Sequence, residues 1–236
     1  MLQPMGTVPV ALSFGAAFAL VRRSYAAAPL PVRLHAVGRF LTCPFLRVLP
    51  FLPPQARILD LGAGHGTFAR LAVEAGASEV IAVEPDARKP LATWRHPRVQ
   101  FVAGYSDAVT GTFDAVTIFD VLCRIPITAW DGLFRQAYDR LPPGGMLLVK
   151  EIDPAHRLKG MWNRGQEKVA DLLGMTLGEA FSYETRDQMR ERLAGLGFER
   201  FTAVELGRGY PHAHILYIAY RKGPLAVQSS ARREMA

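Results

Sequence analysis

The sequence predicts an α/β fold, a doubly wound, mostly parallel seven-stranded sheet with an antiparallel hairpin at its C-terminal end. Two observations support this prediction. From Arg57 onward, short apolar runs rich in branched residues alternate with segments of helical periodicity, and such alternation requires parallel strands joined by right-handed crossovers. The alternation ends with two apolar runs, 198–206 and 213–220, which have no helix between them and therefore pair as antiparallel neighbours.

The element boundaries follow from the same patterns. Thr185 and Gln188 form a capping-box pattern at the start of the last predicted helix, which ends around Gly195 or Gly197. The predicted strands before the hairpin lie near residues 57–61, 79–84, 99–103, 113–119 and 145–151. The predicted helices lie near residues 67–75, 87–93, 130–141 and 185–195.

The chain divides into three predicted regions. Residues 1–54 form a helical N-terminal extension or lid, in which prolines break the segment 29–52 into short helices. Residues 55–223 form the α/β domain, and residues 224–236 form a flexible tail. Within the domain, residues 154–184 are an insertion that leaves from the carboxyl end of the fifth strand, where ligands of open α/β sheets bind. We therefore expect this insertion to act as a lid over a bound ligand.

Composition limits the classes of function. Half of the 236 residues are apolar, which is enough for one full core. Cys43 and Cys123 show neither metal-ligand spacing nor a disulfide pattern, so we expect a reducing, cytoplasmic environment. His212 and His214 lack a cysteine or acidic partner, and no metal site is predicted. Because the chain has no stripe of basic residues with interleaved aromatics, nucleic acid is not an expected partner.

Positive charge is concentrated near the N-terminus. The net charge is +7, and six arginines but no acidic residue precede Asp60. The apolar part of residues 1–21 is short for a membrane-spanning helix and lacks the leading positive charge of a signal peptide. Three interpretations stay open: a lid helix, an interfacial membrane helix with Arg22 and Arg23 at the headgroups, or an acid-poor transit segment. The pattern favours the first two. A helix here would align four apolar residues on one side: Val10, Phe14, Phe18 and Val21.

The loop after the first strand is the most specific local feature. From Asp60 to Gly66 it reads Asp-Leu-Gly-Ala-Gly-His-Gly, with glycine at every second position. A strand, a glycine loop and a helix in this order let the backbone approach a ligand closely and direct helix N–H groups toward it. The second strand ends in Glu84, whose carboxylate can accept hydrogen bonds from a ribose diol. These features predict a nucleotide-type cofactor site.

Several motifs in order resemble the class I S-adenosylmethionine-dependent methyltransferases of the small-molecule type. They are the glycine loop, Glu84, the segment 113–116 leading to Asp120, and the turn 141–149 into the fifth strand. The resemblance covers roughly residues 55–222 and implies a Rossmann-like methyltransferase fold with S-adenosylmethionine as cofactor. The alternative is a nicotinamide-binding domain with an irregular loop, although the spacing G-x-G-x-x-G is absent.

The resemblance also implies roles for individual residues. Gly62 and Gly64 would let the backbone approach the methionine part and the ribose of the cofactor. Asp60 would position the loop or bind the amino group of the cofactor. Glu84 matches the acid of the family that binds ribose. The remaining cofactor contacts implied are Tyr105 and Ser106 at the adenine and Asp120 beside the point of methyl transfer.

Methyl transfer needs a general base only when the acceptor is neutral, such as a hydroxyl, an amine or a carbon acid. Glu151 and His156, at or just past the end of the fifth strand, are the candidate catalytic residues. The unperturbed pKa of histidine suits a general base. The alternative is that His156 caps the lid helix or lies on its surface. Asp153 and Tyr183 are further candidates.

The function predicted from these features is S-adenosylmethionine-dependent methyl transfer to an apolar or aromatic small molecule at oxygen. Met175, Phe181 and Tyr183 in the insertion indicate an apolar acceptor, such as a polyketide, quinone or lipid precursor, or simply pack the lid onto the core. Two alternatives stay open: N-methylation of a lipid headgroup or protein, and a cofactor-binding scaffold without catalysis. The expected partners are a small-molecule acceptor and, as an option, a membrane surface contacted by the N-terminal segment.

Overall fold

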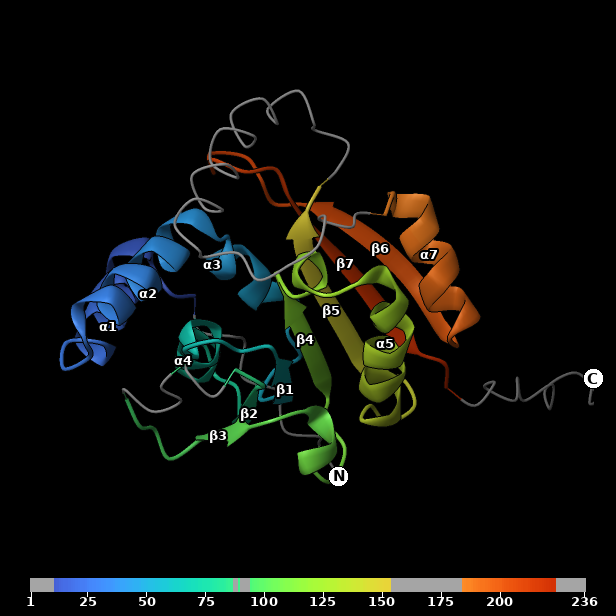
Figure 1. Ribbon diagram of the computed structural model, residues 1–236, viewed down its shortest axis with the longest axis horizontal. Coiled ribbons are helices and arrows are strands. Elements are labelled where there is room, and N and C mark those ends of the chain that lie inside the picture. Colours follow the sequence, from blue (N-terminus) through green and yellow to red (C-terminus); the bar gives the residue numbers. More distant parts are fainter. Residues whose placement is uncertain (1–10, 87–88, 90–93, 154–183, 224–236) are drawn as a thin grey trace, which may run out of the picture.

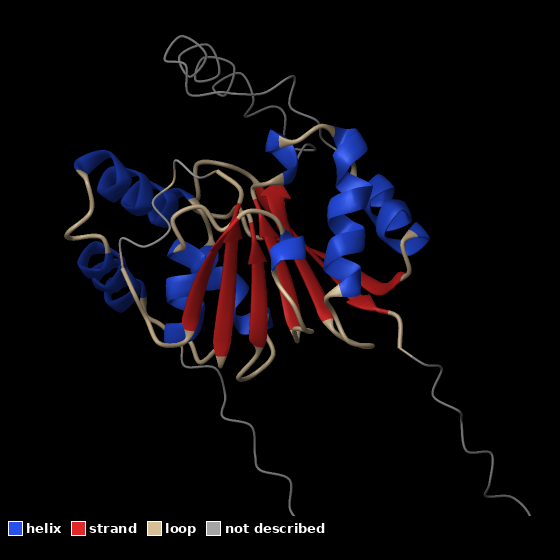
Figure 2. Ribbon diagram, turned by 60° about the horizontal axis from the view of Figure 1, so that its bottom comes forward, coloured by secondary structure: helices blue, strands red, loops and turns tan. Residues whose placement is uncertain are grey.

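The computed structural model describes residues 11–86, 89, 94–153 and 184–223. Its centre is one seven-stranded sheet with the order β3-β2-β1-β4-β5-β7-β6, and helices cover both of its faces (Figure 1, Figure 2). The strands are β1 (Arg57–Leu61), β2 (Glu79–Glu84), β3 (Val99–Ala103), β4 (Ala115–Phe119), β5 (Met146–Ile152), β6 (Phe198–Glu205) and β7 (His214–Arg221).

The helices in the described part of the chain agree closely with the predicted ones. Thr185 caps the last helix through the predicted capping box, in which its side chain accepts from the Gln188 N–H. The helices are α1 (Phe14–Ser24), α2 (Leu30–Thr42), α3 (Phe45–Val48), α4 (Thr67–Glu74), α5 (Trp130–Asp139) and α7 (Arg186–Gly195), with short 3-10 turns η1 (Leu49–Phe51), η2 (Ser106–Ala108), η3 (Leu122–Arg124) and η4 (Ile127–Ala129). Most of the helix predicted near 87–93, the insertion 154–183 and the tail 224–236 lie outside the described residues.

The strand pairing confirms the predicted fold class. Strands β1 to β5 pair in parallel, and β7 pairs antiparallel with both β5 and β6. One strand boundary differs from the prediction by more than one residue, because β4 begins at Ala115 and not at Phe113. The Phe113 N–H donates to the Arg140 carbonyl at the end of α5, so Phe113 belongs to the loop before β4.

Alternate residues of the strands contact two separate hydrophobic clusters, one on each face of the sheet. On β2, Val80 and Ala82 belong to the cluster that includes α1 to α4, whereas Ile81 and Val83 belong to the cluster that includes α5 and α7. This alternation is what a sheet covered on both faces requires, since successive side chains of a strand point to opposite faces.

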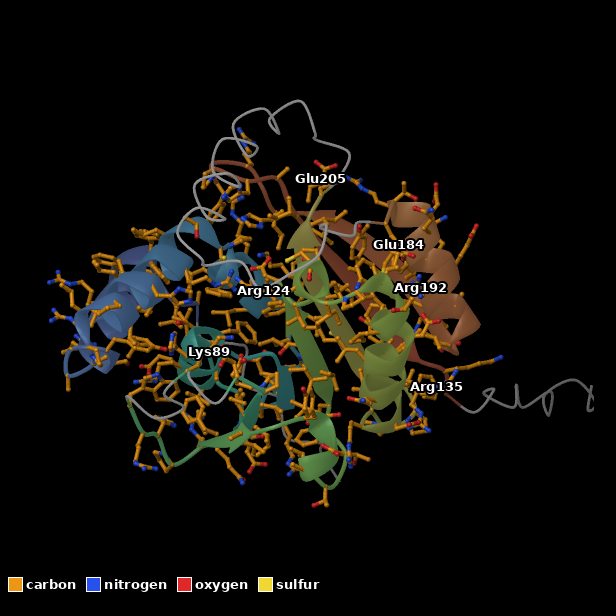
Figure 3. The ribbon with its side chains drawn as sticks, viewed as in Figure 1. Lys89, Arg124, Arg135, Glu184, Arg192 and Glu205 are labelled. Atoms are coloured by element: carbon orange, nitrogen blue, oxygen red, sulfur yellow. The ribbon has the colours of Figure 1, made fainter. Side chains whose placement is uncertain are left out.

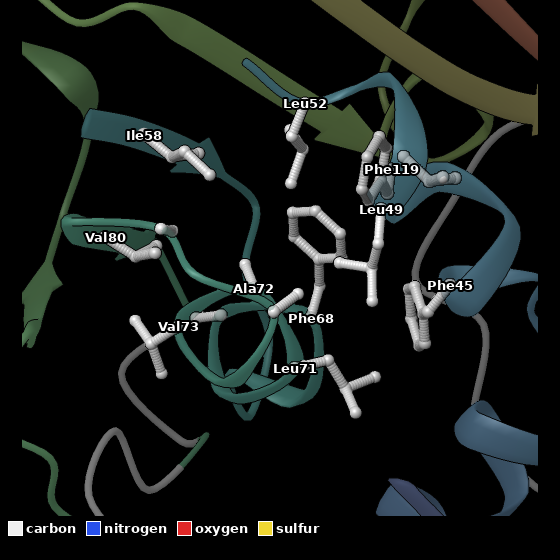
Figure 4. Close-up of a cluster of buried hydrophobic side chains, with 14 of the residues drawn as sticks. Phe45, Leu49, Leu52, Ile58, Phe68, Leu71, Ala72, Val73, Val80 and Phe119 are labelled. Atoms are coloured by element: carbon white, nitrogen blue, oxygen red, sulfur yellow. The ribbon is translucent and has the colours of Figure 1, made fainter. Parts of the chain in front are cut away.

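The N-terminal helices share the core of the α/β domain. Phe45 and Leu49 point toward Phe68 of α4 and Phe119 of β4 (Figure 4), and the Phe68 and Phe119 ring centroids lie 4.6 Å apart. Residues from α1, α2 and α3 all belong to the same cluster of buried side chains as α4. The N-terminal extension is therefore packed onto the domain through one continuous core.

The apolar side predicted for the first helix coincides only partly with its buried side. Ala17, Leu20 and Val21 are buried, whereas Phe14 is 55% exposed. Helix α1 packs against α2 and α4, and Phe14 lies at the outer side of this contact beside the rings of Phe18 and Phe40. Val10 lies outside the described residues. Within the described ranges, no helix is both long enough and apolar enough to cross a bilayer.

Candidate functional site

The predicted ligand-binding residues lie at the carboxyl ends of the parallel strands. Strand β1 lies between β2 and β4, so the chain leaves β1 toward one side and later returns on the other. This is the topological switch point, outside which ligands of open α/β sheets bind. The glycine loop follows β1, and Glu84, Tyr105 and Asp120 stand at or just past the ends of β2, β3 and β4.

Two glycines of the loop serve different purposes. Gly62 has φ +74°, and a Cβ there would lie 2.3 Å from Val121 Cγ2, so this glycine lets the loops after β1 and β4 touch. Gly64 has φ +59°, but a Cβ there would meet nothing within 4 Å. The open backbone at Gly64 is thus the position where a ligand can approach this loop.

Glu84 is buried and joins β2 to the glycine loop. Its Oε2 accepts from the Gly64 N–H at 2.7 Å, and its Oε1 accepts from the Asp86 N–H at 3.1 Å. Lys89, labelled in Figure 3, also donates to Glu84 Oε1 at 2.8 Å. A carboxylate has about four lone-pair positions, so these three bonds leave room for a further donor. The sequence analysis identified Glu84 but not its partner Lys89.

Asp60 presents an unused oxygen at the end of β1. Its side chain is buried, and Oδ1 accepts from the Thr117 hydroxyl at 2.7 Å. Oδ2 is also buried and has no hydrogen-bond partner among the described residues. Burial raises the pKa of Asp60 to about 7. A buried acceptor without a donor is rare in native proteins, and a bound ligand or water that donates to it is one explanation.

Tyr105 and Ser106, the predicted adenine contacts, have different surroundings. Tyr105 is 68% exposed. Ser106 is buried, and its hydroxyl donates to Gln136 Oε1 of α5 at 2.6 Å, while its carbonyl accepts from Arg140. Ser106 therefore connects the loop after β3 to α5, and the contact predicted for these two residues stays a prediction.

Asp120 lies in a cluster of charges that the sequence analysis missed, in which Lys150 is buried and Asp120 and Arg39 are partly buried. Arg39 of α2 donates to Asp120 Oδ2 at 2.5 Å, and Lys150 of β5 forms an ion pair with Oδ1. Burial opposes ionisation of Asp120, but the two cations outweigh it and hold the pKa of its carboxyl well below the usual range. Asp120 has φ +56°, an uncommon backbone conformation for a residue with a side chain. We call Arg39, Asp120 and Lys150 the Asp120 cluster.

Glu151 lies next to this cluster on the same strand as Lys150. Its Oε1 accepts from the Val121 and Leu122 N–H groups at 3.0 and 2.9 Å, which fixes the start of η3. Its Oε2 is buried without a partner in the described part of the chain. Burial, assisted by the negative charge of Asp120, raises the pKa of Glu151 to about 8. At neutral pH the Asp120 cluster thus has one excess positive charge beside a protonated carboxyl.

The other candidate acids and bases are less suitably placed. Asp153 is buried and forms an ion pair with Arg186 at 2.6 Å. His214 Nε2 lies 2.8 Å from the Thr42 carbonyl, and burial lowers the pKa of His214 to about 4. His212 precedes β7, and its ring centroid lies 6.0 Å from that of His214. His156 and Tyr183 lie outside the described residues.

Comparison with known proteins gives the family. A family model described as a methyltransferase domain matches residues 34–202, well over half of the chain. The chain belongs to this methyltransferase family. The predicted family and enzymatic activity are thereby confirmed. No curated protein sequence matches this methyltransferase.

Solved structures share the fold of this methyltransferase at low sequence identity. Human N-acetylserotonin methyltransferase in complex with S-adenosylmethionine is 17% identical with a TM-score of 0.60, over 90% of this chain and 57% of the human one. The 1,6-didemethyltoxoflavin-N1-methyltransferase of Burkholderia thailandensis, with bound substrate and S-adenosylhomocysteine, is 17% identical with a TM-score of 0.56, over 94% and 93% of the two chains.

A third solved structure is a possible histamine N-methyltransferase from Thermotoga maritima. It is 20% identical with a TM-score of 0.57, over 87% of this chain and 100% of that chain. The chain therefore spans just over half of the human enzyme but nearly the whole of the two bacterial ones. Two of the three neighbours hold S-adenosylmethionine or its product, in agreement with the predicted cofactor.

Proposed function

We propose that this methyltransferase moves the methyl group of S-adenosylmethionine to a hydroxyl oxygen of an apolar or aromatic small molecule. One observation supports the proposal best. Two buried carboxyl oxygens have no partners among the described residues: Asp60 Oδ2 on β1 and Glu151 Oε2 on β5, the two strands that flank β4 with its Asp120 cluster. This arrangement suits a ligand with an ammonium group at one end and a reaction that releases a proton at the other.

The residues after β1 and β2 fit the cofactor. Asp60 Oδ2 is a buried acceptor suited to the amino group, and Glu84 has room to accept from a ribose hydroxyl. The open backbone at Gly64 allows close approach. When bound, the sulfonium supplies an already activated methyl group. The main task of the protein is then to hold donor and acceptor in line.

The residues around the carboxyl ends of β4 and β5 fit a hydroxyl acceptor. A hydroxyl must lose its proton as the new carbon–oxygen bond forms, and Glu151, with a pKa of about 8, is our proposed proton acceptor. The excess positive charge of Arg39 and Lys150 over Asp120 would stabilise the developing oxyanion. A neutral amine acceptor develops no oxyanion for this charge to stabilise, so N-methylation of a lipid headgroup or protein has less support.

The decisive experiment for the proposal is a search for the acceptor. The chain is incubated with S-adenosylmethionine carrying a labelled methyl group, together with lipid and metabolite extracts of the host. We expect label in a product that partitions into organic solvent, with the methyl group on oxygen. If the chain binds S-adenosylhomocysteine but transfers no label to any compound, it is a cofactor-binding scaffold and not an enzyme. A labelled methyl group on nitrogen would show that oxygen is the wrong acceptor atom.

Replacing Glu84 by alanine should weaken S-adenosylhomocysteine binding about 10–100-fold. The variant loses a charged acceptor for the ribose, and hydrogen bonds to charged groups contribute about 1.5–3 kcal/mol. Calorimetry measures the change. Glu79→Ala is the matched control, because Glu79 begins the same strand at its opposite end and pairs with Arg57. Equal affinities of the Glu84 variant and the wild type would remove Glu84 from the ribose site.

Affinity for S-adenosylhomocysteine should rise with pH through neutrality. Without ligand, Asp60 holds a proton below about pH 7, and the ligand ammonium must displace that proton to bind the carboxylate. The affinity is therefore expected to be about tenfold lower at pH 6 than at pH 8. Calorimetry in buffers of different ionisation enthalpy would detect the released proton. Asp60→Asn should abolish this pH dependence, and a wild type with no such dependence would place the amino group elsewhere.

A further inference from the structure

Helix α2 has two faces with opposite roles. One face directs Arg39 to Asp120 at the candidate active site. On the other face, Leu30, Leu34 and Leu41 are 61%, 64% and 46% exposed. At 100° per residue these three leucines fall within about 40° of one another and lie roughly 140–180° away from Arg39. We call them the leucine row. Figure 1 shows α1 and α2 at the outer edge of the molecule, away from the sheet.

Positive charge accompanies the leucine row. Arg22 and Arg23 are exposed at the end of α1, immediately before the turn into α2, and Arg33 is exposed on α2 itself. No acidic residue occurs anywhere in residues 1–59. Exposed Phe14 of α1, whose ring lies 5.2 Å from that of Phe40, adds apolar surface to the same helix pair. The pair thus presents exposed apolar side chains with cations and no anions.

We propose that the leucine row and its arginines form a docking surface for an anionic lipid bilayer. Apolar side chains of an amphipathic helix insert at the boundary between headgroups and acyl chains, and arginines attract anionic headgroups. A second copy of this chain is a poorer occupant. A symmetric contact through this surface would bring arginines against arginines with no acidic residue of the segment to pair with them.

The docking surface has a consequence for the reaction, which rests on the proposed function. Because Arg39 and the leucine row belong to one helix, α2 would join the bilayer surface to the end of β4, where Asp120 lies. An apolar acceptor dissolved in the bilayer would then reach the site along α2. The membrane contact itself is tested without cofactor or acceptor, so its failure and that of the proposed function are distinguishable.

The experiment is co-sedimentation of the full chain with vesicles of phosphatidylcholine alone or mixed with phosphatidylglycerol. We expect binding to the anionic vesicles only, weakened by added salt. Replacing the leucine row together (Leu30→Gln, Leu34→Gln, Leu41→Gln) should lower the binding constant at least about tenfold. Ile127→Gln is the matched control, because Ile127 is an exposed apolar residue outside the N-terminal helices and its loss should change nothing.

A second pair of substitutions tests the charge independently. Arg22→Gln with Arg23→Gln should weaken binding to the anionic vesicles about thirtyfold, at about a factor of five for each arginine. Unchanged S-adenosylhomocysteine binding shows that each variant is folded. Wild-type chain that stays in the supernatant, or a leucine-row variant that sediments like the Ile127 control, would overturn the proposal. So would self-association of the wild type that the leucine-row variant abolishes, since the occupant would then be a second copy.

Discussion

Replacing Lys150 by methionine should lower the free energy of unfolding by about 3–5 kcal/mol, the usual cost of removing one partner of a buried ion pair. Lys150 is fully buried on β5 and forms an ion pair with Asp120. Without it, the Asp120 carboxylate remains in the interior with Arg39 as its remaining ion-pair partner among the described residues. Methionine fills a similar volume, so the decrease in the free energy of unfolding comes from removing the charge and not from creating a cavity. Urea denaturation at neutral pH measures it.

Two further variants separate this explanation from a general effect of mutation. Combining Lys150→Met with Asp120→Asn should recover part of the lost stability, because no carboxylate is then left behind and only the partly exposed Arg39 loses its ion-pair partner. Arg190→Met removes an exposed partner of Asp187 within α7, and it should cost about 0.5 kcal/mol or less. A Lys150→Met protein as stable as the Arg190 variant would show that Arg39 alone neutralises Asp120.

Replacing Glu151 by glutamine should lower turnover about 100-fold with the acceptor found by labelling. Glutamine keeps an oxygen for the Val121 and Leu122 N–H groups, so η3 stays fixed while the proton acceptor is lost. Wild-type turnover should rise with pH up to about 8, because the base must be ionised and only about a tenth of Glu151 is ionised at pH 7. The variant should lack this rise.

The control for this substitution is Glu205→Gln at the exposed end of β6, labelled in Figure 3, which should leave turnover unchanged. Affinity of the Glu151 variant for S-adenosylhomocysteine should match that of the wild type, since Glu151 is assigned to the acceptor side. If the variant turns over at the wild-type rate and retains the same pH profile, Glu151 only fixes the backbone of η3, and the proton acceptor lies elsewhere.

Local sequence patterns were sufficient for the fold. Strand boundaries follow apolar runs, the C-terminal hairpin follows from the absent crossover helix, and Thr185 with Gln188 fixes the start of α7. Glu84 was predicted from its position at the end of the second strand, where ligands of open α/β sheets bind. The role of Asp60 came from the resemblance of the glycine loop to the methyltransferase family and not from periodicity.

The Asp120 cluster could not be predicted in this way. Arg39, Asp120 and Lys150 come from α2, the end of β4 and β5, and their contact depends on how α2 docks and how β4 and β5 pair. The one hint of the cluster in the sequence was Lys150, a charged residue within the apolar run that forms β5. Since neighbours on a strand point to opposite faces, Lys150 and Glu151 contact the loop after β4 from different sides. The path of that loop between them is not encoded in any periodicity.

The most direct test of the account is a crystal structure of the chain grown with saturating S-adenosylhomocysteine. The account predicts one molecule over the carboxyl ends of β1 and β4, with its amino group at Asp60 Oδ2 and its ribose at Glu84. No ligand at this edge of the sheet, or a nicotinamide nucleotide that displaces it there, would contradict the central claim.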